Sequence, residues 1–573
     1  MKKLVTILLA LAMILSLSIS VFAEDDEKTV ITIKDPATGT QNARTYEAYK
    51  LLNLKVGHKE ADGEHGYHCP GEHVDECYNY NYSINEKYLE ILQKEVDEHT
   101  DNSFWTALKI TRPAREDINE AHILEYLSNL IGDNGSDYST LRKTADRIYR
   151  DIQAANLDSD ATLAPNADTG VVQESLDKGY WMIVDVKNLA NENDANSVVM
   201  LTTNAYKEII ITPKTSLPEV DKKVKDTDDS DNVSMVDHAW QDSADHDMGD
   251  SIPFKLTATL PSNMDSYEAY TLVFHDTMAA GLTLKPETIK IYVYTNKVVA
   301  DADGNMDNSI TNNVPVFTAP ADKENEETYY NNGNYVIDIT PDHANSDCSF
   351  EITIKNAKDI AAGGNAIVIT YEAVLNENAI LGKDGNVNKV YLEFSNDPYS
   401  DSTGKTAENQ AVVFTYGLTI NKVDALGHAL KGAGFTLEKF SAAENKYVKV
   451  CDEIKGEDLT SFVWKGLDDG DYRLTETTVP AGYNEMDPIT FTIIADHTTN
   501  VATPELKSIT SIVMGNGNID DGMITKNIVN NTGTILPSTG AEGTFLLITF
   551  GAVLVILSAV FMITRKKMSV YED

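Results

Sequence analysis

Cysteine, basic side chains and catalytic motifs are all scarce in this sequence. Four cysteines in 573 residues are too few for a disulfide scaffold. Lysine and arginine total 47 against 89 acidic residues, and the formal net charge of −42 opposes binding to nucleic acid or anionic lipid through bulk charge. No Ser-His-Asp set, Gly-rich phosphate loop or HExxH motif appears. We therefore expect a protein that is not an enzyme, uses no cofactor and binds no nucleic acid.

The N-terminus, "MKKLVTILLALAMILSLSISVFAEDD", has the three parts of a secretory signal peptide. Lys2 and Lys3 form a basic start, Leu4 to Val21 is apolar, and Ala23 is a small residue at the expected cleavage point. The acidic chain that follows at once argues against a retained membrane anchor. We expect residues 1–23 to be removed and the rest of the chain to be exported.

The cysteines and the histidines beside them offer ligand types that zinc can use, but not in a pattern that predicts a zinc site. The segment "EHGYHCPGEHVDEC" (64–77) holds Cys69 and Cys77, but its spacing is not that of a standard zinc site. In an exported chain, a local Cys69–Cys77 disulfide or a polar loop is the favoured interpretation. Cys348 and Cys451 lie in different expected domains and offer no obvious pair.

One acidic segment suggests calcium but does not fit a calcium loop. In "DADGNMDNS" (301–309), Met306 stands where an EF-hand requires glycine, and Asn312 stands where it requires glutamate. We predict no metal in this protein.

The C-terminus carries an apolar run between two distinctive segments. Thr544 to Ile563 contains no charged residue and is long enough to cross the hydrocarbon core, and the basic run 565–567 predicts a cytoplasmic tail. "LPSTG" (536–540) precedes the run. The order resembles the sorting signal of Gram-positive surface proteins, an LPxTG motif that begins here with Leu536 and Pro537. The resemblance implies that a sortase cysteine attacks the carbonyl of Thr539 and releases the chain from Gly540 onward. The alternative is a plain single-span anchor.

Period-two alternation predicts a mostly β protein. In "SIPFKLTATL" (251–260) and "NAIVITYEAVL" (365–375), apolar residues occupy every second position, as in strands that pack against a core. Helical spacing occurs in one region, where Leu141, Ala145 and Ile148 recur on one face. We expect an α+β domain followed by two Ig-like β-sandwiches and a transmembrane helix. The expected boundaries are 1–23, 24–215, 216–416, 417–533 and 534–573.

Each expected sandwich places three polar residues on apolar strand faces. In the second sandwich, Lys422 shares the face of Leu418 and Ile420, while Glu476 and Asn530 fall on apolar faces of later strands. Burial of any one of them alone would be costly. The first sandwich has a parallel set on its own alternating faces: Lys222, Asp276 and Asn388.

Burial would make these sets reactive. Desolvation lowers the pKa of a lysine and raises that of a carboxylic acid, and a neutral amine is a nucleophile. A protonated acid can polarise the asparagine carbonyl and shuttle protons, so a Lys–Asn isopeptide bond could form with loss of ammonia. The alternative is that the residues are at sheet edges and face water. Lys526 also lies on the Asn530 face, so alternation alone does not decide.

Four segments carry a family resemblance. "YRLTETTVPAGY" (472–483) is similar to the E-box of sortase-assembled pilins, and "INKVDALGHALKGAGFTLEK" (420–439) resembles the start of SpaA/CnaB-type domains. "VFHDTMAAGLTL" (273–284) and "NKVYLEFSNDP" (388–398) resemble the CnaA-type fimbrial isopeptide D2 domain. The resemblance implies two bonds, each with an assisting acid: Lys422–Asn530 with Glu476, and Lys222–Asn388 with Asp276. Asn531 and Lys223 are neighbouring alternatives.

The segment "AYKEIIITPKT" (205–215) resembles the WxxxVxVYPKN motif of major pilins. Ile209 and Ile211 take the valine positions and Pro213-Lys214 is kept, whereas Ala205 replaces the tryptophan. The resemblance implies that Lys214 attacks the sortase acyl intermediate. The alternative is an ordinary linker lysine.

We therefore expect a major pilin subunit that a pilus-specific sortase polymerises through Thr539 and Lys214. A housekeeping sortase would join the fibre to peptidoglycan as a surface pilus, after the transmembrane helix had held the precursor. Expected partners are the sortases, other copies of the chain and peptidoglycan, with ancillary pilins and host ligands as further candidates. The rival hypotheses are a monomeric wall-anchored adhesin, an ancillary pilin and a surface enzyme.

Overall fold

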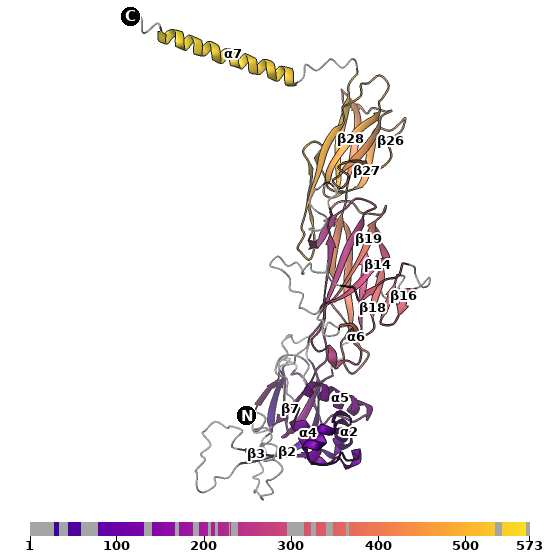
Figure 1. Cartoon of the computed structure of the whole chain (residues 1–573), viewed down its shortest axis with the longest axis vertical. Coiled ribbons are helices and arrows are strands. Elements are labelled where there is room, and N and C mark those ends of the chain that lie inside the picture. Colours follow the sequence, from indigo (N-terminus) through magenta and orange to yellow (C-terminus); the bar gives the residue numbers. More distant parts are fainter. Residues whose placement is uncertain are drawn as a thin grey trace.

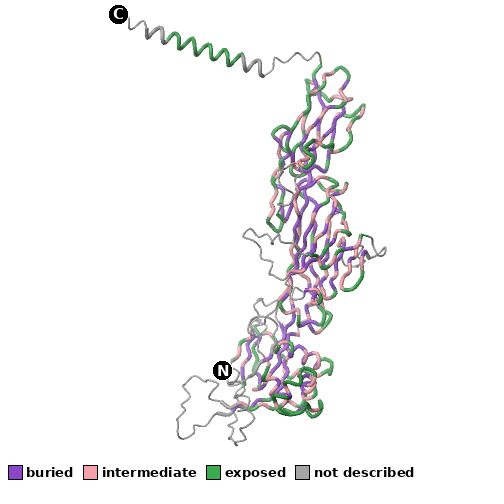
Figure 2. The backbone as a smooth tube through the Cα atoms, viewed as in Figure 1, coloured by how far each residue is buried: buried purple, intermediate pink, exposed green. Residues whose placement is uncertain are grey.

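The computed structural model shows an elongated molecule whose β-rich regions follow one another in chain order (Figure 1). The helices α2, α4 and α5 lie beside the N-terminal sheets, and two sandwiches follow along the long axis. Buried strands run through the middle of each region, with exposed turns at the ends (Figure 2). The structure describes residues 28–33, 44–58, 78–130, 140–166, 171–186, 194–203, 208–211, 216–227, 230, 239–294, 314–321, 328–339, 348–361, 366–532 and 541–568.

The N-terminal region combines two sheets with a layer of helices. One sheet has the order β5-β1-β8, with β8 parallel to β1, and the other has the order β3-β2-β6-β7, with β4 beside β2. The predicted helical face lies toward the core in α5, where Ala145 and Ile148 are buried and Leu141 is half-buried against the same cluster. The strands are β1 (Thr29–Ile33), β2 (Tyr46–His58), β3 (Tyr78–Ile84), β4 (Ala161–Leu163), β5 (Val172–Leu176), β6 (Gly179–Asp185), β7 (Val198–Thr203) and β8 (Glu208–Ile211). The helices are α2 (Leu89–His99), α3 (Asn102–Ala107), α4 (Glu120–Ser128) and α5 (Thr140–Ala154).

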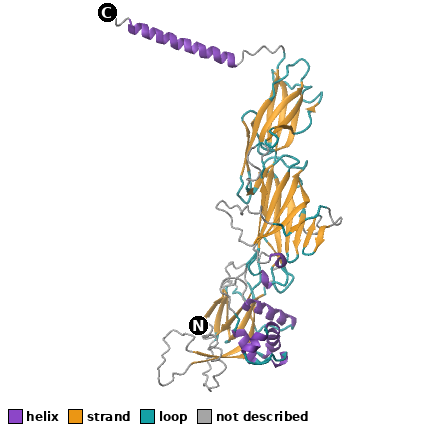
Figure 3. Cartoon of the chain, in the orientation of Figure 1, coloured by secondary structure: helices purple, strands orange, loops and turns teal. Residues whose placement is uncertain are grey.

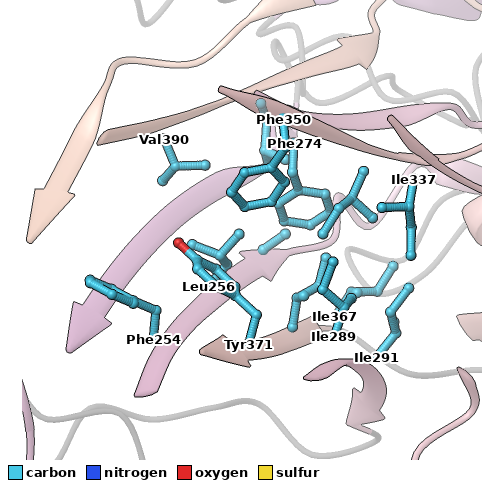
Figure 4. Packing of buried hydrophobic residues seen from close by; sticks show 14 of the residues in the cluster. Phe254, Leu256, Phe274, Ile289, Ile291, Ile337, Phe350, Ile367, Tyr371 and Val390 are labelled. Carbon is cyan, nitrogen blue, oxygen red and sulfur yellow. The ribbon is translucent and has the colours of Figure 1, made fainter. Parts of the chain in front are cut away.

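The middle region packs a six-stranded sheet against an eight-stranded sheet. The first has the order β10-β9-β12-β19-β14-β15, and the second has the order β11-β22-β20-β13-β18-β17-β16, with β21 beside β20. Phe254 and Leu256 of β12 meet Phe274 of β13 and Phe350 of β18 in one apolar core (Figure 4). The strands are β9 (Glu219–Lys225), β10 (Trp240–Gln241), β11 (Ser243–Asp245), β12 (Ser251–Thr259), β13 (Leu272–Met278), β14 (Leu282–Tyr294), β15 (Phe317–Thr318), β16 (Thr328–Asn332), β17 (Tyr335–Asp338), β18 (Phe350–Ile354), β19 (Ala366–Leu375), β20 (Asn386–Ser395), β21 (Thr403–Lys405) and β22 (Asn409–Phe414), with the short helix α6 (Ala357–Ala361).

The C-terminal region is a second sandwich of a three-stranded and a seven-stranded sheet. The small sheet has the order β27-β23-β32, and its first and last strands in the chain, β23 and β32, are parallel neighbours. The larger sheet has the order β25-β24-β28-β29-β30-β31, with β26 beside β24. The strands are β23 (Tyr416–Asp424), β24 (Gly434–Ser441), β25 (Lys446–Lys449), β26 (Ile454–Lys455), β27 (Ser461–Leu467), β28 (Gly470–Thr478), β29 (Ile489–His497), β30 (Leu506–Ser511), β31 (Gly515–Asn516) and β32 (Met523–Asn530).

The predicted fold class, mostly β with an α+β N-terminal region, is confirmed (Figure 3). A helix, α7 (Ala541–Met568), forms where a transmembrane span was expected. In the part of the chain that the structure describes, however, no helix is both long and apolar enough to cross a membrane. The transmembrane part of the prediction is therefore not confirmed.

Polar contacts join each region to the next. Tyr399 of the middle region donates a 2.6 Å hydrogen bond to Asp146 of α5. At the other boundary, Lys439 of the C-terminal region contacts Asp247 of the middle region at 2.5 Å and Asp468 of its own region at 3.0 Å. Each boundary between neighbouring regions thus contains a charged or hydrogen-bonded contact.

Candidate functional site

The middle sandwich brings Lys222, Asp276 and Asn388 together between its two sheets. Lys222 lies in β9 of one sheet, whereas Asp276 in β13 and Asn388 in β20 belong to the facing sheet. All three residues have no exposed surface. The Lys222 Nζ donates to Asp276 Oδ2 at 2.6 Å and to Asn388 Oδ1 at 2.5 Å. The amine therefore lies next to the asparagine carbonyl and the carboxyl group at once.

Tyr371 of β19 completes this site, and the sequence analysis missed its role. Its hydroxyl accepts a 2.9 Å hydrogen bond from Asn388 Nδ2 and donates a 2.9 Å hydrogen bond to Asp276 Oδ2. The hydroxyl thus links the amide nitrogen to the acid. Figure 4 shows the Tyr371 ring among the apolar side chains of the core, with its oxygen at the edge of the cluster. The sequence does contain one indication of this role. Tyr371 places a hydroxyl group on the core-facing side of the strand, the side that Ile369 and Ala373 also occupy.

Burial changes the protonation of this site. It lowers the pKa of Lys222 to about 8, although the charge and hydrogen bond of Asp276 oppose the change. Burial also raises the pKa of Asp276, against the effect of Lys222. The second carboxyl oxygen, Oδ1, is buried and has no hydrogen-bond partner among the described residues, which disfavours the ionised acid. Both changes move the pair toward a neutral amine and a neutral acid.

Two aromatic rings shield the amine of this site. The Nζ of Lys222 lies 5.7 Å from the ring centroids of both Phe254 and Tyr371. The two rings stack on each other with their centroids 5.4 Å apart. Their apolar faces exclude water from the side of the lysine that the polar groups do not cover.

The C-terminal sandwich repeats the arrangement with Lys422, Glu476 and Asn530. Lys422 in β23 and Asn530 in β32 come from parallel neighbouring strands, and Glu476 in β28 faces them from the other sheet. Each residue is at most 2% exposed. The Lys422 Nζ donates to Asn530 Oδ1 and lies 3.1 Å from Glu476 Oε1. Burial lowers the pKa of Lys422, against the hydrogen bond and the charge of Glu476.

The two sites differ in how the acid reaches the amide nitrogen. In the C-terminal site, Asn530 Nδ2 donates directly to both oxygens of Glu476, at 2.9 and 3.0 Å. In the middle site, the tyrosine hydroxyl stands between the amide nitrogen and the acid. Both sites hold the groups for amide transfer, namely an amine of lowered pKa, an amide carbonyl and a buried carboxyl group.

The neighbouring alternatives lie elsewhere. Lys223 points to the other face of β9 and contacts Asp242 at 2.5 Å. Asn531 is exposed. Lys526 donates to the backbone carbonyl of Val513 at 2.9 Å and does not reach the Lys422 site. The positions of these residues in the sheets therefore show which lysine and asparagine belong to each site, a choice that alternation in the sequence could not make.

Several predicted residues lie outside the described residues. They are the sortase motif with Leu536, Pro537, Thr539 and Gly540, the acceptor Lys214, the cysteines Cys69 and Cys77, the signal peptide 1–23 and the acidic segment 301–309.

Known proteins match the chain in its C-terminal part and along its length. The SpaA family, described as a prealbumin-like fold domain, matches residues 417–506, and the LPXTG cell wall anchor motif matches residues 528–569. The trypsin-resistant surface T6 protein of Streptococcus pyogenes serotype M6 is 26% identical over 300 residues, which cover 50% of this chain and 47% of the relative. The match thus spans about half the length of that protein.

Three solved structures are similar to this chain at low sequence identity. The T6 backbone pilin of serotype M6 Streptococcus pyogenes is 15% identical, with a TM-score of 0.48 over 89% of this chain and 99% of that one. The major pilin SpaD of Corynebacterium diphtheriae is 15% identical, with a TM-score of 0.41 over 88% and 98%. The major pilin subunit BcpA of Bacillus cereus is 14% identical, with a TM-score of 0.35 over 66% and 91%. The two family matches agree with the SpaA-type domain and the LPxTG anchor expected from the sequence: the chain contains a SpaA-type prealbumin-like domain and an LPXTG cell wall anchor motif, and over about half its length it is similar to a surface protein of Streptococcus pyogenes.

Proposed function

We propose that the chain is the repeating subunit of a covalent surface fibre. A sortase cleaves between Thr539 and Gly540 and joins the Thr539 carbonyl to the Nζ of Lys214 in another copy, and the base of the fibre is attached to peptidoglycan. The observation that carries this proposal is a buried Lys–acid–Asn set in each of two successive sandwiches. Such sets serve a chain that is pulled from its ends, because each can tie distant strands by a covalent bond. The chain acts as substrate throughout and turns over no other molecule.

The cross-linking step is the same in both sandwiches. The neutral Nζ of the lysine attacks the Cγ of the asparagine, whose carbonyl oxygen it already contacts. The acid lies on the side of the leaving amide nitrogen, directly in the C-terminal site and through the Tyr371 hydroxyl in the middle site. Protons lost by the amine pass through the carboxyl group to the leaving nitrogen, and ammonia departs. The new C–N bond replaces the asparagine C–N bond, so no oxidant, reductant or external energy source is required.

The two bonds would shorten the path along which force travels. From Lys214 to Thr539, the covalent path would run through 214–222, 388–422 and 530–539. It would bypass 223–387 and 423–529, which contain most strands of the two sandwiches. Tension on the fibre would then load these three segments and leave most of the hydrogen-bonded sheets unstrained.

Replacement of Lys214 by alanine tests the polymer. We expect wall extracts boiled in detergent to give a ladder of high-mass species from the native protein and only monomer from Lys214→Ala, because the acyl intermediate then lacks its acceptor amine. An immunoblot reads the result. Lys55→Ala, which removes an exposed lysine of β2, is the matched control and should keep the ladder.

The other outcomes of this blot separate the rival functions. A ladder that survives Lys214→Ala would move the acceptor to another lysine, with 221–225 the first segment to test. A native protein that runs only as a monomer in expressing cells would contradict polymerisation and favour a monomeric wall-anchored adhesin.

Tyr371→Phe tests the tyrosine link of the middle site. We expect the middle bond to form at least about 10-fold more slowly, because phenylalanine keeps the ring but removes the hydroxyl between amide nitrogen and acid. Chains from inclusion bodies would be refolded by dilution, and fragment masses would follow the loss of ammonia with time. The Lys422–Asn530 bond of the same molecules is the internal control, since no tyrosine joins its acid to its amide. Equal rates in Tyr371→Phe and the native chain would remove the tyrosine from the reaction.

A further inference from the structure

A second group of chemically active side chains lies on the outer face of the eight-stranded sheet. His275 of β13 and Glu351 of β18 are register partners on adjacent strands, and Cys348 lies two residues before the start of β18. His275 is the neighbour of Asp276 in the chain, so its side chain points away from the Lys222 site. The group therefore takes no part in the cross-linking chemistry described above.

The donor atoms of these three residues converge. The His275 Nδ1 lies 2.7 Å from Glu351 Oε1, and the Cys348 Sγ lies 3.2 Å from the same oxygen. The Cys348 Sγ and the His275 Nδ1 are 4.0 Å apart. One donor atom from each residue thus lies within 4.8 Å of the other two. In a tetrahedral zinc site with usual bond lengths, such atoms are about 3.3–3.5 Å apart, so shifts of well under 1 Å would form the site.

The chemical types of the donors select the metal. Calcium and magnesium take oxygen ligands, whereas a thiolate and an imidazole with one carboxylate suit zinc. Zinc sites with three protein ligands keep a fourth position for water. The partial exposure of Cys348 leaves a route for the ion to enter.

The surroundings of His275 hold its ring in the orientation that a ligand needs. The far ring nitrogen, Nε2, lies 3.4 Å from Glu393 Oε2 of β20. This separation does not meet hydrogen-bond geometry, but it places a carboxylate on the side of the ring to which metal-bound histidines commonly direct their second nitrogen. The ring also stacks on Tyr391, with 4.5 Å between the centroids and 10° between the planes. His275 and Glu351 are 7% and 6% exposed, so both ligands are set in place by the sheet.

The acidic cluster at the boundary between the sandwiches is a weaker candidate. Asp245, Asp468 and Asp469 also bring carboxylate oxygens close together. However, the Nζ of Lys439 lies 3.0 Å from Asp468, and the Nε2 of His497 lies 3.3 Å from Asp245. Cationic side chains of the protein therefore already neutralise part of the negative charge of these carboxylates, which weakens their attraction for a metal ion.

We propose that His275, Cys348 and Glu351 form a zinc-binding site. Binding displaces two protons to solvent, the thiol proton of Cys348 and the Nδ1 proton that His275 directs at Glu351, while the ring carries its remaining proton on Nε2 beside Glu393. The Cys348 sulfur, the His275 Nδ1 and a Glu351 oxygen are then joined to one Zn²⁺. The ion fastens the segment before β18 to β13, the strand that carries Asp276 on its inner face. The site is independent of sortase and of pilus assembly.

Cobalt and zinc titrations of the secreted chain test the proposal. We expect native protein and Cys451→Ser to bind one more equivalent of Zn²⁺ than Cys348→Ser in competition with a chromophoric chelator. Co²⁺ should give a sulfur-to-metal charge-transfer band that Cys348→Ser lowers and Cys451→Ser keeps. Cys451 is the matched control because it is an exposed cysteine of the other sandwich. Any metal held by the Cys69–Cys77 segment is common to all three proteins and cancels in the comparison.

A variant-free measurement guards against a folding defect in Cys348→Ser. Zinc should protect Cys348 of the native chain from iodoacetamide at least about 10-fold, while Cys451 stays reactive. The proposal is overturned if zinc leaves the alkylation of Cys348 unchanged. It is also overturned if folded Cys348→Ser binds as many equivalents as the native chain.

Discussion

Glu476→Gln and Asp276→Asn should each leave one lysine and one asparagine unreacted, so that the chain carries one ammonia molecule more than the native protein. The amide keeps the shape of the acid, but it cannot take up a proton from the amine and pass one to the leaving nitrogen. Loss of general acid–base catalysis typically costs about 10²–10⁴ in rate. Glu476 also contacts the amine at 3.1 Å and the leaving nitrogen at 2.9 Å, so its loss affects both ends of the step.

Intact mass spectrometry of the purified chains measures this effect, after allowance for the substitution itself. Asp452→Asn and Asp384→Asn are matched controls, because each neutralises an exposed carboxylate in the same two regions. Both should keep the native loss of two ammonia molecules. Complete bond formation in Glu476→Gln would mean that the acid only fills space and that burial of Lys422 suffices.

Strand alternation could predict the residues of both sites but not the full geometry. A period of two places Lys422 and Asn530 on core faces, and the structure finds both there because β23 and β32 each cover the core with one face. The same period also selects Lys526, whose side chain turns to the Val513 carbonyl instead. Alternation carries no information on which residues of one sheet meet those of the other.

Tyr371 and the proposed zinc ligands show two further limits. From the sequence, a tyrosine on a core-facing strand position is predicted to be a packing residue. Only the position of its hydroxyl in the structure reveals the hydrogen bond from Tyr371 to Asp276. In the sequence, Cys348 and Cys451 lie in different expected domains, so nothing there indicates a role for Cys348. Its neighbours His275 and Glu351 become visible only once β13 and β18 are known to pair across a long stretch of chain.

Asn530→Ala should lower the stability of the C-terminal sandwich by about 4–5 kcal/mol, by analogy with the loop-entropy model for disulfides. The cross-link would close a loop between residues 108 positions apart and so restrict the unfolded chain. Asn530→Ala is a cleaner test than loss of the lysine, because Lys422 and Glu476 keep each other as an ion pair at 3.1 Å. Removal of Lys422 would instead leave a buried carboxylate without its cation, which is costly by itself.

Thermal unfolding of the secreted chain measures the difference, and a loss of this size corresponds to a fall in the midpoint of roughly 15–30 °C for that sandwich. Asn531→Ala is the matched control, since it truncates the exposed asparagine next in the chain and should keep both the bond and the midpoint. The two variants also separate chemistry from packing. If Asn530→Ala lacks the bond but unfolds at the native temperature, the cross-link resists force or proteolysis without adding equilibrium stability. If Asn531→Ala also fails to release the ammonia of this bond, then Asn531 and not Asn530 is the residue that reacts, and the register of β32 is wrong by one residue.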